Sequence, residues 1–326
     1  MSAMRLLLAR VGAGKTTEAQ HRLLELKRAQ PMAKAWVLLS TDRQIVDFRR
    51  RFMANGRVFF NVEYFNFYSL YHHLLANAGI AQRSLDDTAR FGLIRALLAD
   101  LYPQGGGIFG GIAHTPGFVR IIASFIYELK QNLVDPDDFK KAAQTPKEVE
   151  LADIYAEYQL ALTRHNLVDR EGEGWLALDQ LIDHPEIARS VDLLIVDGYD
   201  QFNALQAALL TVLGAAVRDA IVTLTTVPGR EATIGRRFQD ALERLEYAHR
   251  AFEKPLELIT LDAPGDDDRH PALRHLSGQL LRPRPERVPT MGVVQWIEAP
   301  DPAREVGAVL RRVKRLLLDG CAPTTS

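Results

Sequence analysis

Cysteine is nearly absent from this 326-residue sequence, which contains only Cys321. One cysteine excludes an internal disulfide and any zinc or iron–sulfur site built from several cysteines of this chain, and it suits a reducing compartment. Long hydrophobic runs are missing too, because none approaches the roughly 20 apolar residues that span a bilayer. The N-terminus also lacks the pattern of a signal peptide. We therefore expect a soluble, cytoplasmic protein with no membrane partner.

The sequence also has no excess of positive or negative charge. The 40 lysines and arginines are balanced by 41 aspartates and glutamates, which leaves a net charge of −1. No overall attraction to nucleic acid is expected, so any contact with DNA must come from a local patch. Hydrophobic residues make up 47% and charged residues 25%, as in ordinary globular proteins, and the length suggests about two domains.

A glycine-rich turn lies between a predicted strand, Met4 to Leu8, and an amphipathic helical pattern that begins near Lys15. Strand, turn and helix in this order are the context of a phosphate-binding loop. Gly12 and Gly14 let the backbone curl so that its N–H groups point at phosphate oxygens, and the helix adds its positive end. Ala9 stands where the usual pattern has its first glycine. The competing interpretation is a tight turn followed by a solvated lysine.

We predict that this turn binds ATP together with Mg²⁺. The ammonium group of Lys15 would reach the terminal phosphates, and the hydroxyl of Thr16 would hold the metal. Asp197 ends a buried apolar run and could hold the same ion. The predicted nucleotide-binding residues are Val11, Gly12, Ala13, Gly14, Lys15, Thr16 and Thr17.

The residue after Asp197 is Gly198, where a hydrolytic ATPase usually places a glutamate that polarises the attacking water. Asp200 is the nearest substitute, so Lys15, Asp197 and Asp200 are the candidate catalytic residues. Lys15 and Asp197 are 182 positions apart (197 − 15). This interval is long for a small phosphotransferase and favours a core that carries an insertion.

The remaining pattern predicts an α/β fold, a parallel sheet flanked by helices, with an inserted all-helical subdomain. Further strands are expected at 36–40, 58–67, 192–197, 220–226, 256–261 and 293–298. The predicted organisation is a first domain over 1–83 and 188–265, a helical subdomain over 84–187, a linker with a short helix over 266–292, and a strand–helix pair over 293–326. Because one strand–helix pair has little to pack against, we expect a longer protein to continue past Ser326.

Two groups of residues could contact DNA. Arg50 and Arg51 belong to a predicted helix over 42–53, where they form either a solvated face or contacts with phosphates. The aromatic residues between positions 59 and 71 either fill the core or stack on bases.

These motifs together resemble superfamily 1 DNA helicases of the UvrD/RecB type, most closely the N-terminal helicase-like half of AddB/RexB helicase–nuclease subunits. Ala9–Thr17 resembles their first helicase motif, Leu38–Arg51 is similar to motif Ia, and Tyr64–Leu70 is similar to the segment after it. Val196–Phe202 reads Val-Asp-Gly-Tyr-Asp-Gln-Phe. Active helicases have Asp-Glu there, whereas the AddB group has Asp-Gly-Phe or similar.

The resemblance implies a P-loop, RecA-like motor domain (1A) with a helical 1B insertion, followed by the start of a second motor domain. It implies DNA contacts at Ser40, Thr41, Arg50, Arg51, Asn66 and Ser69. It also implies an AddA/RexA-type helicase–nuclease subunit as heterodimer partner in double-strand-break repair, with this half binding single-stranded DNA or a duplex end as a scanning scaffold and its motor degenerate. An active superfamily 1 helicase and an unrelated P-loop phosphotransferase remain as alternatives.

Overall fold

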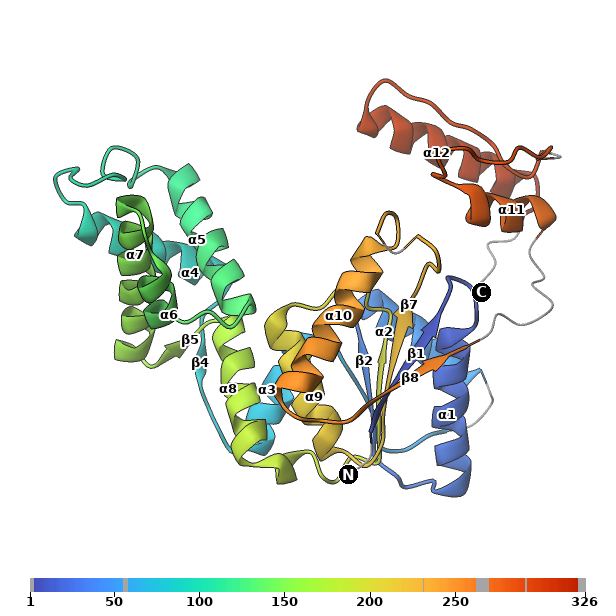
Figure 1. The fold of residues 1–326 in the computed structure, drawn as a ribbon, viewed down its shortest axis with the longest axis horizontal. Coiled ribbons are helices and arrows are strands. Elements are labelled where there is room, and N and C mark those ends of the chain that lie inside the picture. Colours follow the sequence, from blue (N-terminus) through green and yellow to red (C-terminus); the bar gives the residue numbers. More distant parts are fainter. Residues whose placement is uncertain (1–2, 55–57, 231, 262–269, 291, 322–326) are drawn as a thin grey trace. The chain divides into compact units, whose positions relative to one another are not determined.

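The computed structural model describes residues 3–54, 58–230, 232–261, 270–290 and 292–321. The chain divides into two compact units, Met1–Ala263 and Pro264–Ser326. The first unit is a mixed α/β structure whose sheet is flanked by helices (Figure 1). The sequence-based prediction of the fold class is therefore confirmed.

The first unit begins with the elements β1 (Met4–Ala9), α1 (Lys15–Ala29), β2 (Ala35–Leu39), α2 (Asp42–Met53), β3 (Val62–Phe65), α3 (Phe67–Asn77), β4 (Arg83–Ser84), α4 (Asp87–Leu101), α5 (Pro116–Gln131), α6 (Pro136–Ala142) and α7 (Pro146–Arg164). It continues with β5 (Leu167–Val168), α8 (Arg170–Asp183), a short 3₁₀ helix (Pro185–Ile187), β6 (Leu193–Asp197), α9 (Ala204–Ala216), β7 (Ala220–Thr225), α10 (Arg236–Ala251) and β8 (Leu256–Thr260).

Six parallel strands form the main sheet in the order β3-β2-β6-β7-β1-β8. From β1 the chain crosses to β2 and β3 at one edge of the sheet. It then returns through β6 and β7, next to β1, and ends with β8 on the other side of β1. In such doubly wound sheets, ligands bind outside the carboxyl ends of the strands. The turn after β1, the turn after β2 and the residues after β6 all lie at this edge.

The side chains of the strands alternate between two cores. In β1, Leu6 and Leu8 belong to a cluster with α3, α8, α9 and α10, whereas Leu7 belongs to a second cluster with α1 and α2. Figure 1 shows helices on both sides of the sheet. Both faces are buried, so the strands are runs of apolar residues rather than alternating ones, as is typical of parallel sheets.

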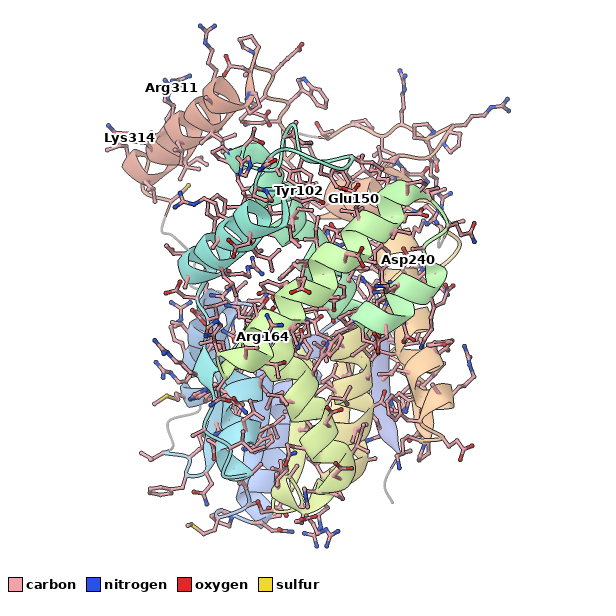
Figure 2. All side chains as sticks on the ribbon, turned by 90° about the vertical axis from the view of Figure 1, so that its left-hand side faces the viewer. Tyr102, Glu150, Arg164, Asp240, Arg311 and Lys314 are labelled. Carbon is pink, nitrogen blue, oxygen red and sulfur yellow. The ribbon has the colours of Figure 1, made fainter. Side chains whose placement is uncertain are left out.

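The helical insertion has a core of its own, formed by α4, α5 and α7 around Tyr155 and Tyr158. The loop between α4 and α5 is fixed to α7 by Glu150, whose carboxylate accepts hydrogen bonds from the Tyr102 hydroxyl (3.0 Å) and the Ile108 amide (2.7 Å). Figure 2 shows Tyr102 and Glu150 next to this loop. A Cβ at Gly110 would lie 2.1 Å from the Gly106 carbonyl oxygen, so the loop needs glycine at this position.

Helix α8 joins the helical insertion to the sheet-side core. It packs on α3 and α9, and its buried Leu178 and Leu181 are part of the sheet-side cluster. Its N-cap, Asp169, accepts hydrogen bonds from Lys130 of α5 (2.6 Å) and Tyr158 of α7 (3.0 Å), and both ionic side chains are almost fully buried. The insertion is therefore joined to the sheet by a buried ion pair at the start of one helix.

Two predicted strands differ in the structure. The strand expected from Val58 to Phe67 is present only as β3, because β3 is an edge strand whose partner β2 offers pairing only from Val62 to Phe65. Val58 is exposed, and Asn61 has a positive φ of 53°. The strand expected over 293–298 is wrong, since this segment has no regular secondary structure. Among the described residues of the second unit no strand is present that could pair with it.

The second unit contains α11 (Pro271–Gln279) and α12 (Pro302–Leu318). Asp301 caps α12 by accepting a hydrogen bond from the Arg304 amide (2.8 Å), and Pro302 is the first residue of the helix. The apolar side chains of α12 are largely exposed, with Val306 at 58% and Leu310 at 60%. The predicted second motor domain, and the division of the chain at 84, 188, 266 and 293, stay predictions.

Candidate nucleotide-binding site

The turn after β1 has the backbone geometry that its two glycines predict. Gly12 (φ 78°) and Gly14 (φ 82°) are both in the left-handed region, and Gly14 is the N-cap of α1. This conformation costs a residue with a Cβ about 1 kcal/mol or more. A Cβ at Gly14 would meet no atom within 4 Å, so space is open beside the first turn of the helix.

The predicted nucleotide-binding residues lie together at this turn. Val11 and Thr17 are exposed and Ala13 is buried, while the side chains between Gly14 and Thr17 are half-buried. The Lys15 ammonium donates to the carbonyl oxygens of Ala9 (3.1 Å) and Arg10 (2.9 Å). Burial lowers the pKa of Lys15, and the nearby Asp197 carboxylate raises it to a smaller extent. A partly desolvated ammonium on a glycine turn is suited to an anionic ligand.

Asp197 is buried at the end of β6, and two hydroxyls donate to it. Thr16 Oγ1 donates to Asp197 Oδ2 (2.8 Å), and the hydroxyl of the buried Thr223 donates to Asp197 Oδ1. The sheet explains this arrangement, because β7 lies between β6 and β1. The structure thus brings Thr16 and Asp197, the predicted metal ligands, into direct contact.

These oxygens fit Mg²⁺, a hard cation that prefers hydroxyl and carboxylate oxygens and takes its remaining ligands from water and phosphate. In the described parts of the chain, no group of three or more His, Cys, Asp or Glu side chains is arranged to hold a metal ion alone. At this turn, a bound phosphate would supply further oxygen ligands.

Gly198 and Asp200 follow Asp197. Gly198 is exposed, with φ 77°, and a Cβ there would lie 2.6 Å from Gln44 Oε1. The Asp200 carboxylate accepts a hydrogen bond from Arg237 of α10 (3.1 Å). Its predicted catalytic role stays a prediction, and the structure gives it an arginine as partner.

The residues predicted to contact DNA divide into two places. Thr41 caps α2 and Asn66 caps α3, and the Asn66 amide donates to Asp42 (3.2 Å), so the N-termini of these helices are adjacent. Ser40 and Ser69 lie beside these caps. Arg50 and Arg51 lie at the C-terminal end of α2, roughly 13 Å along the helix from Asp42 at 1.5 Å per residue.

Sequence reasoning missed Thr223 and Gln44. Thr223 is a hydroxyl within the otherwise apolar start of β7, and parallel pairing of Val196 with Val222 puts the next two residues side by side. That isolated polar residue in a buried strand was a usable signal. Gln44 gave none, because its contact depends on the conformation of Gly198.

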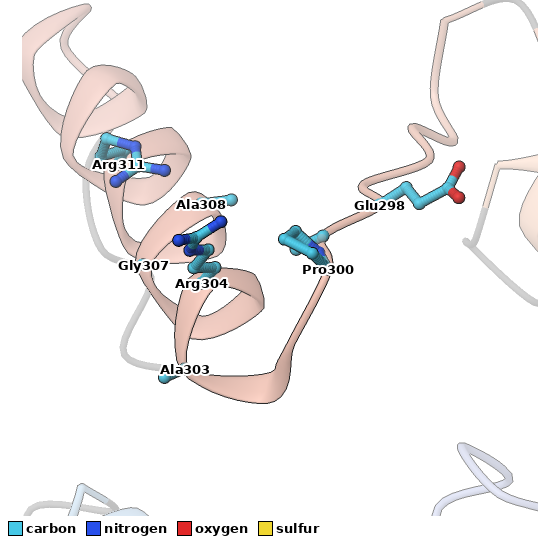
Figure 3. A pocket seen from close by; sticks show the side chains of 8 residues that line it. Glu298, Pro300, Ala303, Arg304, Gly307, Ala308 and Arg311 are labelled. Carbon is cyan, nitrogen blue, oxygen red and sulfur yellow. The ribbon is translucent and has the colours of Figure 1, made fainter.

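A separate hollow of about 560 Å³ lies in the second unit, between the segment 298–300 and α12 (Figure 3). Arg304 and Arg311 line it from one side of the helix. It holds none of the predicted site residues. Among the described helices, none has the length and apolar character to cross a bilayer.

The parallel sheet with its glycine turn at the carboxyl edge defines an α/β protein of the RecA-like type. Residues 6–276 match the family described as ADDB, N-terminal. The chain belongs to this family.

Curated relatives agree with this assignment. The chain is 25% identical over 346 residues to a protein of Moorella thermoacetica and 23% identical over 357 residues to one of Symbiobacterium thermophilum, each covering 96% of this chain and 29% of the relative. A protein of Exiguobacterium sibiricum is 23% identical over 226 residues, covering 67% of this chain and 19% of the relative. All three are named as a subunit of an ATP-dependent helicase/deoxyribonuclease. The chain therefore spans less than a third of the length of the curated relatives it matches.

Proposed function

We propose that this chain is the nucleotide- and DNA-binding, helicase-like part of a helicase–nuclease subunit that acts in the repair of DNA double-strand breaks. The contact between Thr16 and Asp197 carries the proposal. It joins the hydroxyl that follows the turn's lysine to a buried carboxylate, and these are the two oxygens that would hold Mg²⁺ beside the phosphates of ATP. The names of the relatives support the helicase and deoxyribonuclease setting.

The proposed motor binds ATP but hydrolyses it slowly or not at all. Gly198 supplies no general base. The Asp200 carboxylate is paired with Arg237 of α10. Lys15 would neutralise phosphate charge, and Thr16 and Asp197 would position the metal, which promotes binding without activating a water. We propose no nuclease chemistry for this chain.

The proposed DNA surface is the edge formed by the N-termini of α2 and α3, with Ser40, Thr41, Asn66 and Ser69. Helix N-termini favour phosphate because their amide groups and dipoles are positive. Arg50 and Arg51 would extend this surface along α2. The proposed protein partner is an AddA/RexA-type helicase–nuclease subunit, which would supply the active motor.

A thermal-shift titration with Mg-ATP tests nucleotide binding. At 100 times its dissociation constant, a ligand adds about 2.7 kcal/mol to stability. We expect a shift in the wild type, a strongly reduced shift in Lys15→Ala, and an unchanged shift in the control Lys147→Ala, whose side chain is exposed at the start of α7. No shift in the wild type, or equal shifts in wild type and Lys15→Ala, would overturn the proposal.

Release of inorganic phosphate separates the alternatives. The proposed degenerate motor gives release close to the buffer rate with and without single-stranded DNA. DNA-stimulated release that Lys15→Ala abolishes would instead indicate an active helicase. Transfer of phosphate to a small molecule without any response to DNA would indicate a phosphotransferase.

A further inference from the structure

Gln44 occupies the space beside Gly198. A Cβ on Gly198 would lie 2.6 Å from Gln44 Oε1, 3.0 Å from its Cδ and 3.1 Å from its Nε2. Real Cβ atoms essentially never come within 3.0 Å of another atom. The backbone after Asp197 therefore approaches the carboxamide of Gln44 so closely that only glycine fits without a shift.

Ser40 holds this carboxamide in place. Gln44 Oε1 accepts hydrogen bonds from the Ser40 amide (3.1 Å) and the Ser40 hydroxyl (2.6 Å). The Gln44 backbone is also fixed, because its amide donates to the side chain of Thr41, the N-cap of α2 (3.3 Å). Moving the carboxamide away from Gly198 would break both hydrogen bonds to Ser40. It acts as a fixed neighbour rather than a flexible one.

A second contact joins the segment after β2 to the segment after β6. Strands β2 and β6 are adjacent, with Leu39 paired to Asp197, so Ser40 and Gly198 are the next residues at one edge of the sheet. The Tyr199 hydroxyl donates to the Leu39 carbonyl oxygen (2.8 Å). Tyr199 is two residues after Asp197, which accepts a hydrogen bond from Thr16. Leu39 directly precedes Ser40 and Thr41.

We propose that Gln44 is a positioning residue that transmits the state of the nucleotide site to the DNA surface. A ligand that draws Asp197 towards a metal displaces the backbone of Gly198. Because Gln44 packs directly on that backbone and is bonded to Ser40, the displacement reaches the N-terminus of α2. This inference rests on the proposed function, since it needs both a nucleotide at Lys15 and DNA at Ser40 and Thr41.

The test measures the affinity of a labelled single-stranded oligonucleotide by fluorescence anisotropy, with and without a saturating non-hydrolysable Mg-ATP analogue. Couplings between sites of one protein typically change affinity by about 5- to 150-fold. We expect a change of at least about fivefold in the wild type and less than twofold in Gln44→Ala, with unchanged affinity of Gln44→Ala for the nucleotide. The control Gln239→Ala, a half-buried glutamine on α10 whose carboxamide donates to Glu243 (2.9 Å), should behave as the wild type.

The outcomes separate the two proposals. If the wild type fails to bind the analogue in a thermal-shift assay, both the proposed function and the inference fail. If the wild type binds analogue and DNA but Gln44→Ala keeps the full nucleotide effect, or the wild type has none, only the inference fails. A mere loss of folding in Gln44→Ala would lower its thermal midpoint and its nucleotide affinity, and would also overturn the positioning role.

A second measurement tests the contact itself. Gly198→Ala should lower the thermal midpoint more in the wild-type background than in the Gln44→Ala background. The cost of a positive φ is present in both backgrounds. The difference between the two shifts therefore isolates the contact between the added methyl group and the Gln44 carboxamide. Equal shifts of the thermal midpoint in the two backgrounds would show that Gln44 does not contact position 198, and would overturn the inference.

Discussion

Thr16 and Asp197 are 181 positions apart in the sequence, yet the Thr16 hydroxyl donates a 2.8 Å hydrogen bond to the Asp197 carboxylate. The contact exists because β1 and β6 flank β7 in one parallel sheet, so that their carboxyl ends meet at the same edge. Of the intervening helices, α4, α5 and α7 form a core of their own, and α8 packs on both α5 and α9.

Replacing Asp197 by Asn should remove the advantage of Mg²⁺ in nucleotide binding. The amide keeps the size and one acceptor oxygen, but it lacks the negative charge that a hard divalent cation requires. In a thermal-shift assay the wild type should be stabilised more by Mg-ATP than by ATP with EDTA, and Asp197→Asn should respond equally to both. Asp192→Asn, near the other end of β6, is the matched control, because Asp192 accepts from the Lys34 amide (2.9 Å) away from the turn. A retained preference for Mg-ATP in Asp197→Asn would contradict the metal role.

Lys130→Met should destabilise the protein by about 3–5 kcal/mol, because it leaves the buried Asp169 carboxylate without its cationic partner. Urea unfolding followed by circular dichroism measures this loss. Lys140→Met removes an exposed ion pair with Asp153 and should change stability little. Equal effects of the two substitutions would mean that the Lys130–Asp169 pair does not hold the insertion to α8.

Stability should fall as the pH rises towards 8 because of Glu171. Burial raises the pKa of this carboxyl to about 7, and the charge of Asp169 adds to the shift, while Arg90 and Lys130 oppose it. An ordinary glutamate titrates near 4.5. The folded state therefore binds the proton more tightly than the unfolded state, so this contribution is complete below pH 4.5 and is lost progressively between pH 4.5 and about 7.

Glu171→Gln should remove that loss, which is on the order of 3 kcal/mol. Free energies of unfolding measured between pH 5 and 8 should therefore decline less in the variant than in the wild type. Glu243→Gln, an exposed position on α10, should leave the decline unchanged. A wild-type slope in Glu171→Gln would show that this carboxyl does not titrate in the predicted range.

The sequence was sufficient to predict those parts of the fold that depend on local pattern. Helix α2 has the predicted bounds of Asp42 and Met53, and α1 begins at Lys15, where the helical pattern starts. Glycine in the left-handed conformation at positions 12 and 14 also followed from the motif. Periodicity and capping act within a few residues, so one sequence contains this information.

Contacts between distant segments could not be predicted in the same way. The segment from Val293 has the apolar pattern of a strand, but a strand needs a partner, which the described residues of its unit do not supply. The approach of Gln44 to Gly198 depends on the pairing of β2 with β6 and on a single φ angle. The buried pair of Lys130 and Asp169 likewise depends on how three helices meet.

Arg50 and Arg51 should make the affinity for single-stranded DNA depend more steeply on salt. If both arginines contact phosphates of a single strand, Arg50→Ala/Arg51→Ala should weaken binding and lower the slope of log affinity against log salt by about 1.4 units, or about 0.7 per contact. A strand bound at Thr41 must run along α2 to reach them, and Arg50 also pairs with Asp47 (3.3 Å). Anisotropy titrations of a labelled oligonucleotide across salt concentrations measure the slope.

Arg244→Ala/Arg250→Ala is the matched control, because it removes two exposed arginines from α10 and the same net charge. With a net charge of −1, binding rests on local contacts, so this control should keep the wild-type slope. Equal slopes for the α2 variant, the control and the wild type would confine the DNA surface to the N-termini of α2 and α3. A reduced slope in both variants would mean that the affinity for DNA depends on the overall charge of the chain. The proposed local surface would then be wrong.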